Sequence, residues 1–136
     1  MPAVDRHPVL LAVGPQARHR LQRILGGDCD LRHVASTTEL LQALDPAVHD
    51  MVVVGAHFDE SHTLDVLARI FHHDHARIVV CVCGRRGLLG EATVNGLGLA
   101  SRVLGARGFV DLTAYPDDDA GDARIRSLFQ RLLGPA

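Results

Sequence analysis

The chain has 136 residues, of which 47% are hydrophobic, so it is long enough to bury the core of one domain and too apolar to be disordered. Its formal net charge of −2 comes without a basic stripe, which argues against direct nucleic-acid binding by this domain. The apolar runs are too short to span a membrane, and the N-terminal run lacks the basic lead-in of a signal peptide. We therefore expect a cytoplasmic protein with a single domain over residues 1–136.

Strand-like and helix-like segments alternate along the whole chain. The strand-like segments are short apolar runs, and the helix-like segments have apolar residues three and four positions apart. In chain order the predicted elements are a strand at 8–14, a helix at 17–25, a strand at 29–35, a helix at 36–44, a strand at 50–55, a helix at 63–71, a strand at 77–83, a helix at 92–104, a strand at 106–112 and a helix at 122–133. This alternation predicts an α/β fold, a five-stranded doubly wound parallel sheet in a three-layer, flavodoxin-like sandwich.

Several helices carry local signals. Ser36 and Glu39 have the spacing of a capping box at the start of the second helix, and Pro46 ends that helix. Apolar spacing in the third helix predicts one buried face made of Leu64, Leu67, Ala68 and Phe71. In the fifth helix the same spacing predicts a buried stripe made of Ile125, Leu128, Phe129 and Leu132.

Two phrases lie around the third and fifth predicted strands: DMVVVGAHFDES at residues 50–61 and LGARGFVDL at residues 104–112. With the fivefold alternation and the length, they resemble the receiver domain of bacterial two-component response regulators. The resemblance covers nearly the whole chain and implies a role in signal transduction. It also implies where phosphorylation chemistry would lie: a carboxylate pair after strand one, a phosphoacceptor aspartate after strand three, a hydroxyl residue after strand four and a lysine after strand five.

None of these chemical groups is found at the matching positions. The residues there are Gly14 and Pro15 after strand one, Gly55 after strand three, Val82 or Cys83 after strand four, and Leu112 after strand five. The chain has no lysine, because all 14 of its Lys and Arg residues are arginine. Asp59 and Glu60 lie in the loop after Gly55, but without an acidic partner after strand one they make a poor Mg²⁺ site. We therefore expect a module that signals without phosphorylation, with no catalytic residue, metal or cofactor.

The resemblance also implies an interaction surface. Receivers use the fourth helix, fifth strand and fifth helix for dimerisation and output, which here implies residues 95–104, 109–112 and 124–132. We expect a protein partner or a second copy to bind this face through Arg102, Arg107, Phe109, Arg126 and Phe129. Phe109 also stands where receivers keep an aromatic that moves on activation, although an aromatic at strand spacing is more often a core residue.

Three other interpretations were weighed. The loop after strand four carries Arg85 and Arg86, which suit an anion, so a sensor of an anionic metabolite or nucleotide in the vacated pocket is the alternative function. An enzyme with Cys81 or Cys83 as nucleophile has no base in its motif, although His57 could approach across the loop. The third is a metal site built from the histidine-rich end of the third helix and the loop before that helix. Its candidate ligands are His57, His62, His72, His73, Asp74 and His75. A helix end exposed to solvent is the better interpretation of these residues.

Overall fold

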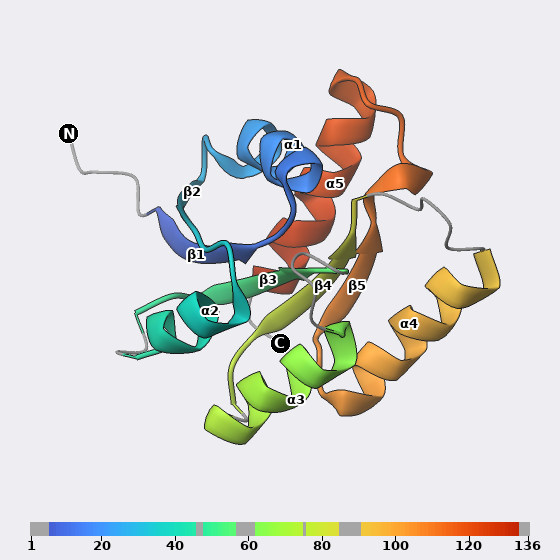
Figure 1. Cartoon of the computed structure of the whole chain (residues 1–136). Coiled ribbons are helices and arrows are strands. Elements are labelled where there is room, and N and C mark those ends of the chain that lie inside the picture. Colours follow the sequence, from blue (N-terminus) through green and yellow to red (C-terminus); the bar gives the residue numbers. More distant parts are fainter. Residues whose placement is uncertain (1–5, 46–47, 57–61, 75, 85–90, 134–136) are drawn as a thin grey trace.

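The centre of the protein is a sheet of five parallel strands. The computed structural model describes residues 6–45, 48–56, 62–74, 76–84 and 91–133. The strands lie in the order β2-β1-β3-β4-β5, and each neighbouring pair is parallel (Figure 1). Their bounds are β1 His7–Ala12, β2 Cys29–His33, β3 Met51–Gly55, β4 Val79–Cys83 and β5 Gly108–Asp111. The predicted five-stranded, doubly wound sheet is confirmed, with β2 and β5 at its two edges.

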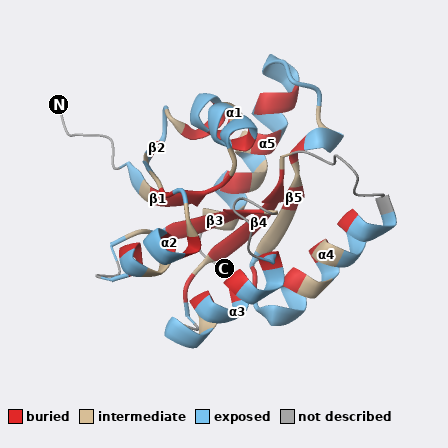
Figure 2. Ribbon diagram, in the orientation of Figure 1, coloured by how far each residue is buried: buried red, intermediate tan, exposed pale blue. Residues whose placement is uncertain are grey.

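Helices cover both faces of this sheet. Their bounds are α1 Pro15–Leu25, α2 Thr37–Ala43, α3 Thr63–His73, α4 Glu91–Leu104 and α5 Asp119–Leu133, with a short 3-10 turn, η1, at Leu112–Ala114. Helices α1 and α5 lie on one face, and α2, α3 and α4 lie on the other (Figure 1). The inner strands β3 and β4 are therefore buried along their whole length (Figure 2). In the part of the chain that the structure describes, no helix is long and apolar enough to cross a membrane.

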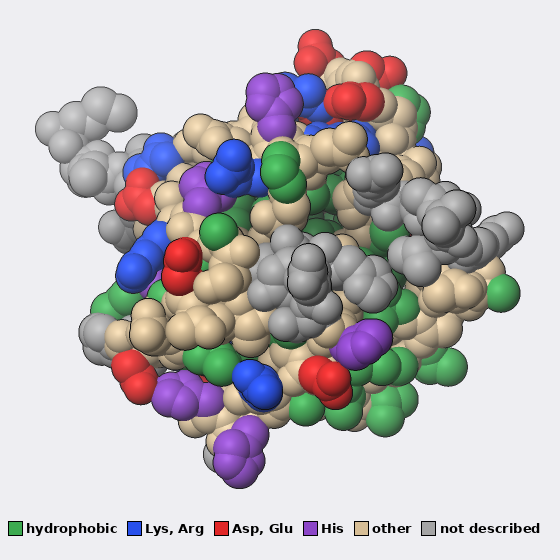
Figure 3. Space-filling model, in the orientation of Figure 1, with side chains coloured by type: hydrophobic (Ala, Val, Ile, Leu, Met, Phe, Trp, Pro, Cys, Tyr) green, Lys and Arg blue, Asp and Glu red, His purple; other side chains and the backbone are tan. Residues whose placement is uncertain are grey.

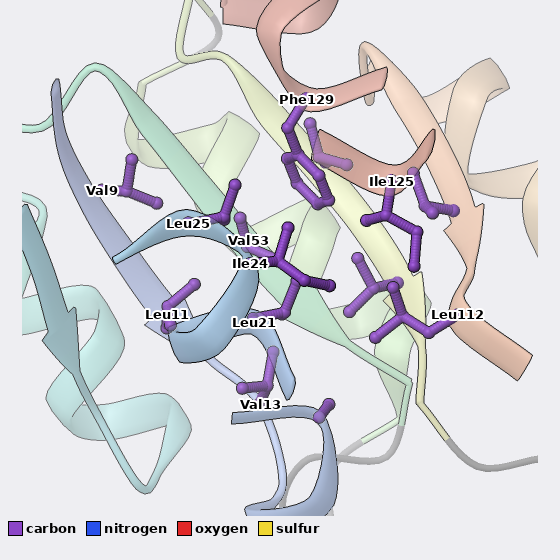
Figure 4. Packing of buried hydrophobic residues seen from close by; sticks show 14 of the residues in the cluster. Val9, Leu11, Val13, Leu21, Ile24, Leu25, Val53, Leu112, Ile125 and Phe129 are labelled. Carbon is purple, nitrogen blue, oxygen red and sulfur yellow. The ribbon is translucent and has the colours of Figure 1, made fainter. Parts of the chain in front are cut away.

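Alternate side chains of the strands supply two apolar cores. The core beneath α1 and α5 includes Leu11, Leu21, Val53, Ile125 and Phe129 (Figure 4). The core beneath α2 and α3 includes Leu10, Leu40, Val52, Leu67 and Ile70. Because full burial of one such side chain is worth about 1.5–3 kcal/mol relative to exposure, these two clusters are the main favourable contribution to folding.

Element boundaries differ from the predictions where a turn is fixed by local chemistry. Strand β1 ends at Ala12, two residues early, because Gly14 is the N-cap of α1 and Pro15 its first residue, where a missing N–H has no cost. Strand β5 ends at Asp111, because the Asp111 carboxylate accepts the Thr113 N–H at 3.0 Å and turns the chain into η1.

Helix α2 has the predicted start. The Ser36 hydroxyl accepts the Glu39 N–H at 3.1 Å, and the Glu39 carboxylate accepts the N–H of Ala35 at 3.0 Å. The two side chains thus satisfy backbone donors that the first turn of a helix leaves unpaired. Pro46, predicted to end this helix, lies outside the described residues.

The predicted buried face of α3 is half right: Leu67 is fully buried and Phe71 packs partly buried against the core, but the other two predicted residues are exposed. The residues that α3 buries are Thr63, Val66, Leu67 and Ile70. Leu64 is 36% exposed and Ala68 is exposed, although both were predicted to be buried. The two rows are neighbours on the helix and both are apolar, so the packing of α3 onto the sheet decides between them.

Candidate functional site

The residues after β1 begin a helix and do not form a polar pocket. Gly14 has extended backbone angles, and its carbonyl oxygen accepts the Arg18 N–H at 2.9 Å. Pro15 follows as the first residue of α1. The two positions that the receiver resemblance assigns to a carboxylate pair therefore supply a helix start without any side-chain oxygen.

The end of β3 packs directly against the end of β1. Gly55 is buried, and a Cβ atom at this position would lie 3.1 Å from Cα and 3.2 Å from Cβ of Val13. At the end of β4, a Cβ atom on Gly84 would lie 2.6 Å from Cβ of Ala17 in α1. Because these contacts are so close, neither Gly55 nor Gly84 has room for a side chain unless its neighbour moves.

The remaining two matching positions belong to the core. Cys83 is fully buried at the end of β4, and Leu112 is 1% exposed and points into the core beneath α5, beside Ile125 (Figure 4). Burial also raises the pKa of the neighbouring Cys81 thiol to about 12, so this thiol is protonated at neutral pH. Neither cysteine is accessible as a nucleophile.

Five residues of the predicted sites lie outside the described residues: His57, Asp59, Glu60, Arg85 and Arg86. The sensor alternative, which depends on Arg85 and Arg86, stays a prediction. At the far end of α3, His73 Nε2 lies 3.1 Å from a carboxylate oxygen of Asp45, and His75 is outside the described residues. Among the residues that the structure does describe, no three His, Cys, Asp or Glu side chains are grouped closely enough to hold a metal ion.

An arginine of α1 holds the connection between β5 and α5. Arg20 Nη1 donates to the Leu112 carbonyl oxygen at 2.6 Å, and Nη2 donates to the Pro116 carbonyl oxygen at 2.7 Å. Nη2 also lies 3.2 Å from the Tyr115 carbonyl oxygen. One guanidinium group therefore satisfies several backbone acceptors of a loop and fixes that loop onto α1.

A second arginine of α1 binds the start of α5. Arg23 Nε donates to Asp122 Oδ2 at 2.7 Å, and Nη2 donates to Oδ1 at 2.9 Å, a bidentate pair. Arg23 also donates to Asp117. The Asp122 side chain is only 5% exposed, and the hydrogen bonds from Arg23 hold its pKa below the usual range although burial opposes them.

This pair predicts acid sensitivity. Because the pKa of Asp122 is lower in the folded chain than in the unfolded chain, where it is about 3.9, its contribution to stability is complete near neutral pH and falls as pH drops through the folded-state pKa. Asp122→Asn should be less stable at pH 7 and should have a flatter stability profile between pH 5 and 2, measured by urea unfolding. Asp119→Asn, at an exposed position in the same helical turn, should keep the wild-type profile; an Asp122→Asn profile parallel to wild type would contradict the assignment.

A groove of about 590 Å³ runs along β5, and we call it the β5 groove. It is bounded by α4, β5 and α5, and it brings together side chains from all three elements: Arg102, Arg107, Phe109, Tyr115, Arg131 and Leu132. In Figure 1, β5 lies at the sheet edge, with α4 in front of the sheet and α5 behind it. Three of the residues predicted for the interaction surface, Arg102, Arg107 and Phe109, line this groove.

Close packing positions the groove's walls. A Cβ atom on Gly98 of α4 would lie 3.0 Å from Cδ1 of the Phe109 ring, so α4 approaches β5 closely because Gly98 has no side chain. Phe109 is half-buried, with its ring under α4. On the other side, Arg107 Nη1 donates to the Leu132 carbonyl oxygen at 3.1 Å, which places a cation beside the carbonyl end of α5.

Two residues predicted for the interaction surface lie elsewhere. Phe129 is fully buried in the core beneath α5, so its side chain is not available to a partner. Arg126 Nε donates to the Ile24 carbonyl oxygen at 2.9 Å, so Arg126 is directed toward α1 and away from β5. Both corrections follow from the rotation of α5 about its axis, which directs Ile125 and Phe129 to the sheet.

Two groove residues were not named among the predicted contacts: Arg131, which falls within the predicted range 124–132, and Tyr115, which falls outside all the predicted ranges. Arg131 lies beside Leu132 on the flank of the predicted apolar stripe, and helical spacing could have placed it there. Tyr115 follows η1, where no periodicity applies, and the guanidinium carbon of Arg124 lies 5.1 Å from the centre of its ring.

A second groove, between α3 and α4, is apolar. It has a volume of about 570 Å³, and Figure 3 shows hydrophobic side chains gathered over these two helices. Leu99 and Val103, which line it, are 69% and 79% exposed. Leu64 and Ala68, the row of α3 that the sheet leaves exposed, form its other wall.

This strand order, with two helices on one face and three on the other, is the fold of a response-regulator receiver domain, and structural comparison confirms it. The chain is similar to the BeF3-activated DrrB receiver domain (12% identity, TM-score 0.69, 95% of this chain and 98% of that one). It is also similar to the receiver domain of an HD domain-containing protein from Pseudomonas fluorescens Pf-5 (19%, 0.69, 98% and 91%). A third similar structure is HP1043, an orphan response regulator of H. pylori (13%, 0.68, 98% and 100%). No protein-family model and no curated protein matches the sequence.

Proposed function

We propose that this protein is a receiver-like signalling module that works without phosphorylation and binds a protein partner or a second copy through the β5 groove. The observation that carries the proposal is a contrast between the carboxyl end of the sheet and the β5 edge of the same sheet. At the positions that the receiver resemblance assigns to phosphoryl chemistry, the described residues offer no carboxylate, hydroxyl or amine, and Gly55, Cys83 and Leu112 are buried. Along β5, in contrast, an open groove presents arginines and an aromatic ring.

The composition of the groove supports an interaction role. Exposed Arg102 and Arg107 stand at its rim, and Phe109 contributes apolar surface. Arginine and aromatic side chains are the types enriched at the centres of protein interfaces. The module itself is a binding protein and not an enzyme.

The test combines a chemical assay with a binding assay. Incubation with acetyl phosphate and Mg²⁺ should add no phosphoryl mass to the intact protein, and beryllofluoride should leave its melting temperature unchanged. Self-association, measured by sedimentation, or binding to a copurified partner should be the same with and without these reagents. A phosphoryl adduct would overturn the proposal.

A separate pair of double variants tests whether the β5 groove is the contact surface. Arg102→Glu with Arg107→Glu should weaken association by at least about tenfold, because two arginines at a contact surface become acids. Arg18→Glu with Arg69→Glu changes the net charge by the same amount at exposed positions away from the β5 groove and should leave association unchanged. Equal association by both double variants would show that another face is used.

A further inference from the structure

Among the residues that the structure describes, one side of the β5 backbone has no neighbouring strand. The Arg107 N–H donates to the Val79 carbonyl oxygen of β4 at 2.7 Å, and β5 has β4 as its one neighbour in the sheet. Because backbone groups in a strand alternate in direction, Phe109 and Asp111 also face β4, while the N–H and C=O groups of Gly108 and Val110 point away from β4. Gly108 is half-buried and Val110 is only 4% exposed, so a narrow strip of this backbone edge reaches the groove. A row of backbone N–H and C=O groups without a neighbouring strand can pair with an added strand.

The unpaired side of β5 opens into the β5 groove. Four consecutive residues of β5, 108–111, line the groove together with side chains of α4 and α5. Neighbouring strands lie about 4.8 Å apart, so an extended segment in the groove would be close enough to pair with Gly108 and Val110. Its side chains would alternate between the α4 wall and the α5 wall.

The charge of the groove favours an acidic occupant. Arg102, Arg107 and Arg131 line it, and among the described lining residues Asp111 is the one acid. The Asp111 carboxylate already accepts the Thr113 N–H at 3.0 Å and the Thr113 hydroxyl at 2.6 Å. The net potential offered to a partner is therefore positive, over an apolar floor that includes Phe109.

We propose that an extended acidic segment of a protein partner binds here by adding a strand to β5. Its backbone pairs with Gly108 and Val110, and its carboxylates pair with Arg102, Arg107 and Arg131. This inference rests on the proposed function, because it specifies what occupies the same groove. A nucleic acid fits less well, since it has no backbone N–H and C=O groups to match the strand edge.

The test uses a fluorescein-labelled hexapeptide that alternates glutamate and valine, with binding measured by fluorescence anisotropy. The wild-type protein should bind it, and added salt should weaken the binding. A matched peptide with N-methyl groups on every amide has no N–H to donate on either edge and should bind at least about tenfold more weakly, because the hydrogen bonds from its backbone to β5 are lost. A lysine–valine peptide should bind more weakly still.

The protein variants separate this inference from the proposed function. Arg102→Glu with Arg107→Glu should lose at least about tenfold in affinity for the glutamate–valine peptide, and the Arg18→Glu, Arg69→Glu control should not. Leu99→Gln with Val103→Gln in the α3–α4 groove should also bind normally. Equal binding of the N-methylated peptide, tighter binding of the lysine peptide, or equal binding of a single-stranded DNA hexamer would overturn strand addition.

Failure of the two proposals would look different. If no peptide binds but the Arg102→Glu, Arg107→Glu variant still abolishes association with the partner or second copy, strand addition is wrong and the interaction face stands. If that variant leaves association unchanged as well, the proposed function fails with it. Circular dichroism of each variant establishes that it is folded.

Discussion

Replacing Gly121 with alanine should destabilise the protein by about 2 kcal/mol or more, although alanine is the better helix former. Gly121 lies in the first turn of α5 and is buried, and a Cβ atom there would overlap the carbonyl oxygen of Pro116. That carbonyl group cannot move away freely, because Arg20 holds it at 2.7 Å. Forcing atoms into a packed site costs about 1–3 kcal/mol and occasionally more, which exceeds the gain of about 1 kcal/mol from helix propensity.

The matched control is another helical glycine. Gly96 lies in α4, is exposed, and has nothing within 4 Å of its would-be Cβ atom. Gly96→Ala should therefore raise stability by up to about 1 kcal/mol. Thermal and urea unfolding of both variants should show opposite signs, with Gly121→Ala melting about 10 °C or more below wild type. An unchanged melting temperature for Gly121→Ala would mean that the loop between β5 and α5 is not held as described.

Placing an aspartate at position 55 should lower stability and should not create a phosphorylation site. The Cβ atom of Gly55→Asp would meet the backbone and side chain of Val13 at 3.1–3.2 Å. The added carboxyl group would lie at the carboxyl end of the sheet, where the described positions that the receiver resemblance assigns to phosphoryl chemistry are apolar, including Leu112. The chain also contains no lysine that could bind a phosphoryl oxygen. We expect a loss of about 2–4 kcal/mol, from overpacking and from burial of a polar group.

Two further variants separate the steric contribution to this loss of stability from the contribution of the charge. Gly55→Ala carries the steric part alone, and Gly55→Asn carries nearly the same volume as aspartate without its charge. Urea unfolding gives the stabilities, and intact mass after incubation with acetyl phosphate and Mg²⁺ reports phosphorylation. A phosphoryl adduct on Gly55→Asp, absent from Gly55→Asn, would show that the surrounding chain retains phosphotransfer chemistry and would count against a phosphorylation-independent module.

The sheet could be predicted because its inner strands are buried on both faces. Residues 51–54 and 79–83 are uninterrupted apolar runs, and their short length and high valine content favour buried strands over helices. The α3 face could not be predicted, because Leu64 and Ile70 lie on adjacent rows that are both apolar. The choice between the rows depends on where α3 sits against the sheet and α4, which is not encoded within the helix itself.

The candidate site could be predicted only in part, because a helical pattern does not fix how the helix packs against its neighbours. Periodicity in α5 identified the stripe that contains Phe129, and a residue that fills the core cannot also serve a partner. Periodicity does not say which neighbour flanks each side of the stripe, so Arg126 was assigned to the β5 side although it binds α1. The contact between Val13 and Gly55 joins the ends of two strands far apart in sequence, and only the folded chain reveals it.

The three buried thiols can report on opening motions of the folded protein. Cys29 lies on the edge strand β2, whereas Cys81 and Cys83 lie at 0% exposure in the inner strand β4. A thiol reagent reaches each of them only when the surrounding structure opens, and the free energy of opening differs between edge and centre. The relative labelling rates of Cys29 and Cys81 therefore distinguish fraying of one edge from cooperative opening of the whole sheet, without any introduced probe.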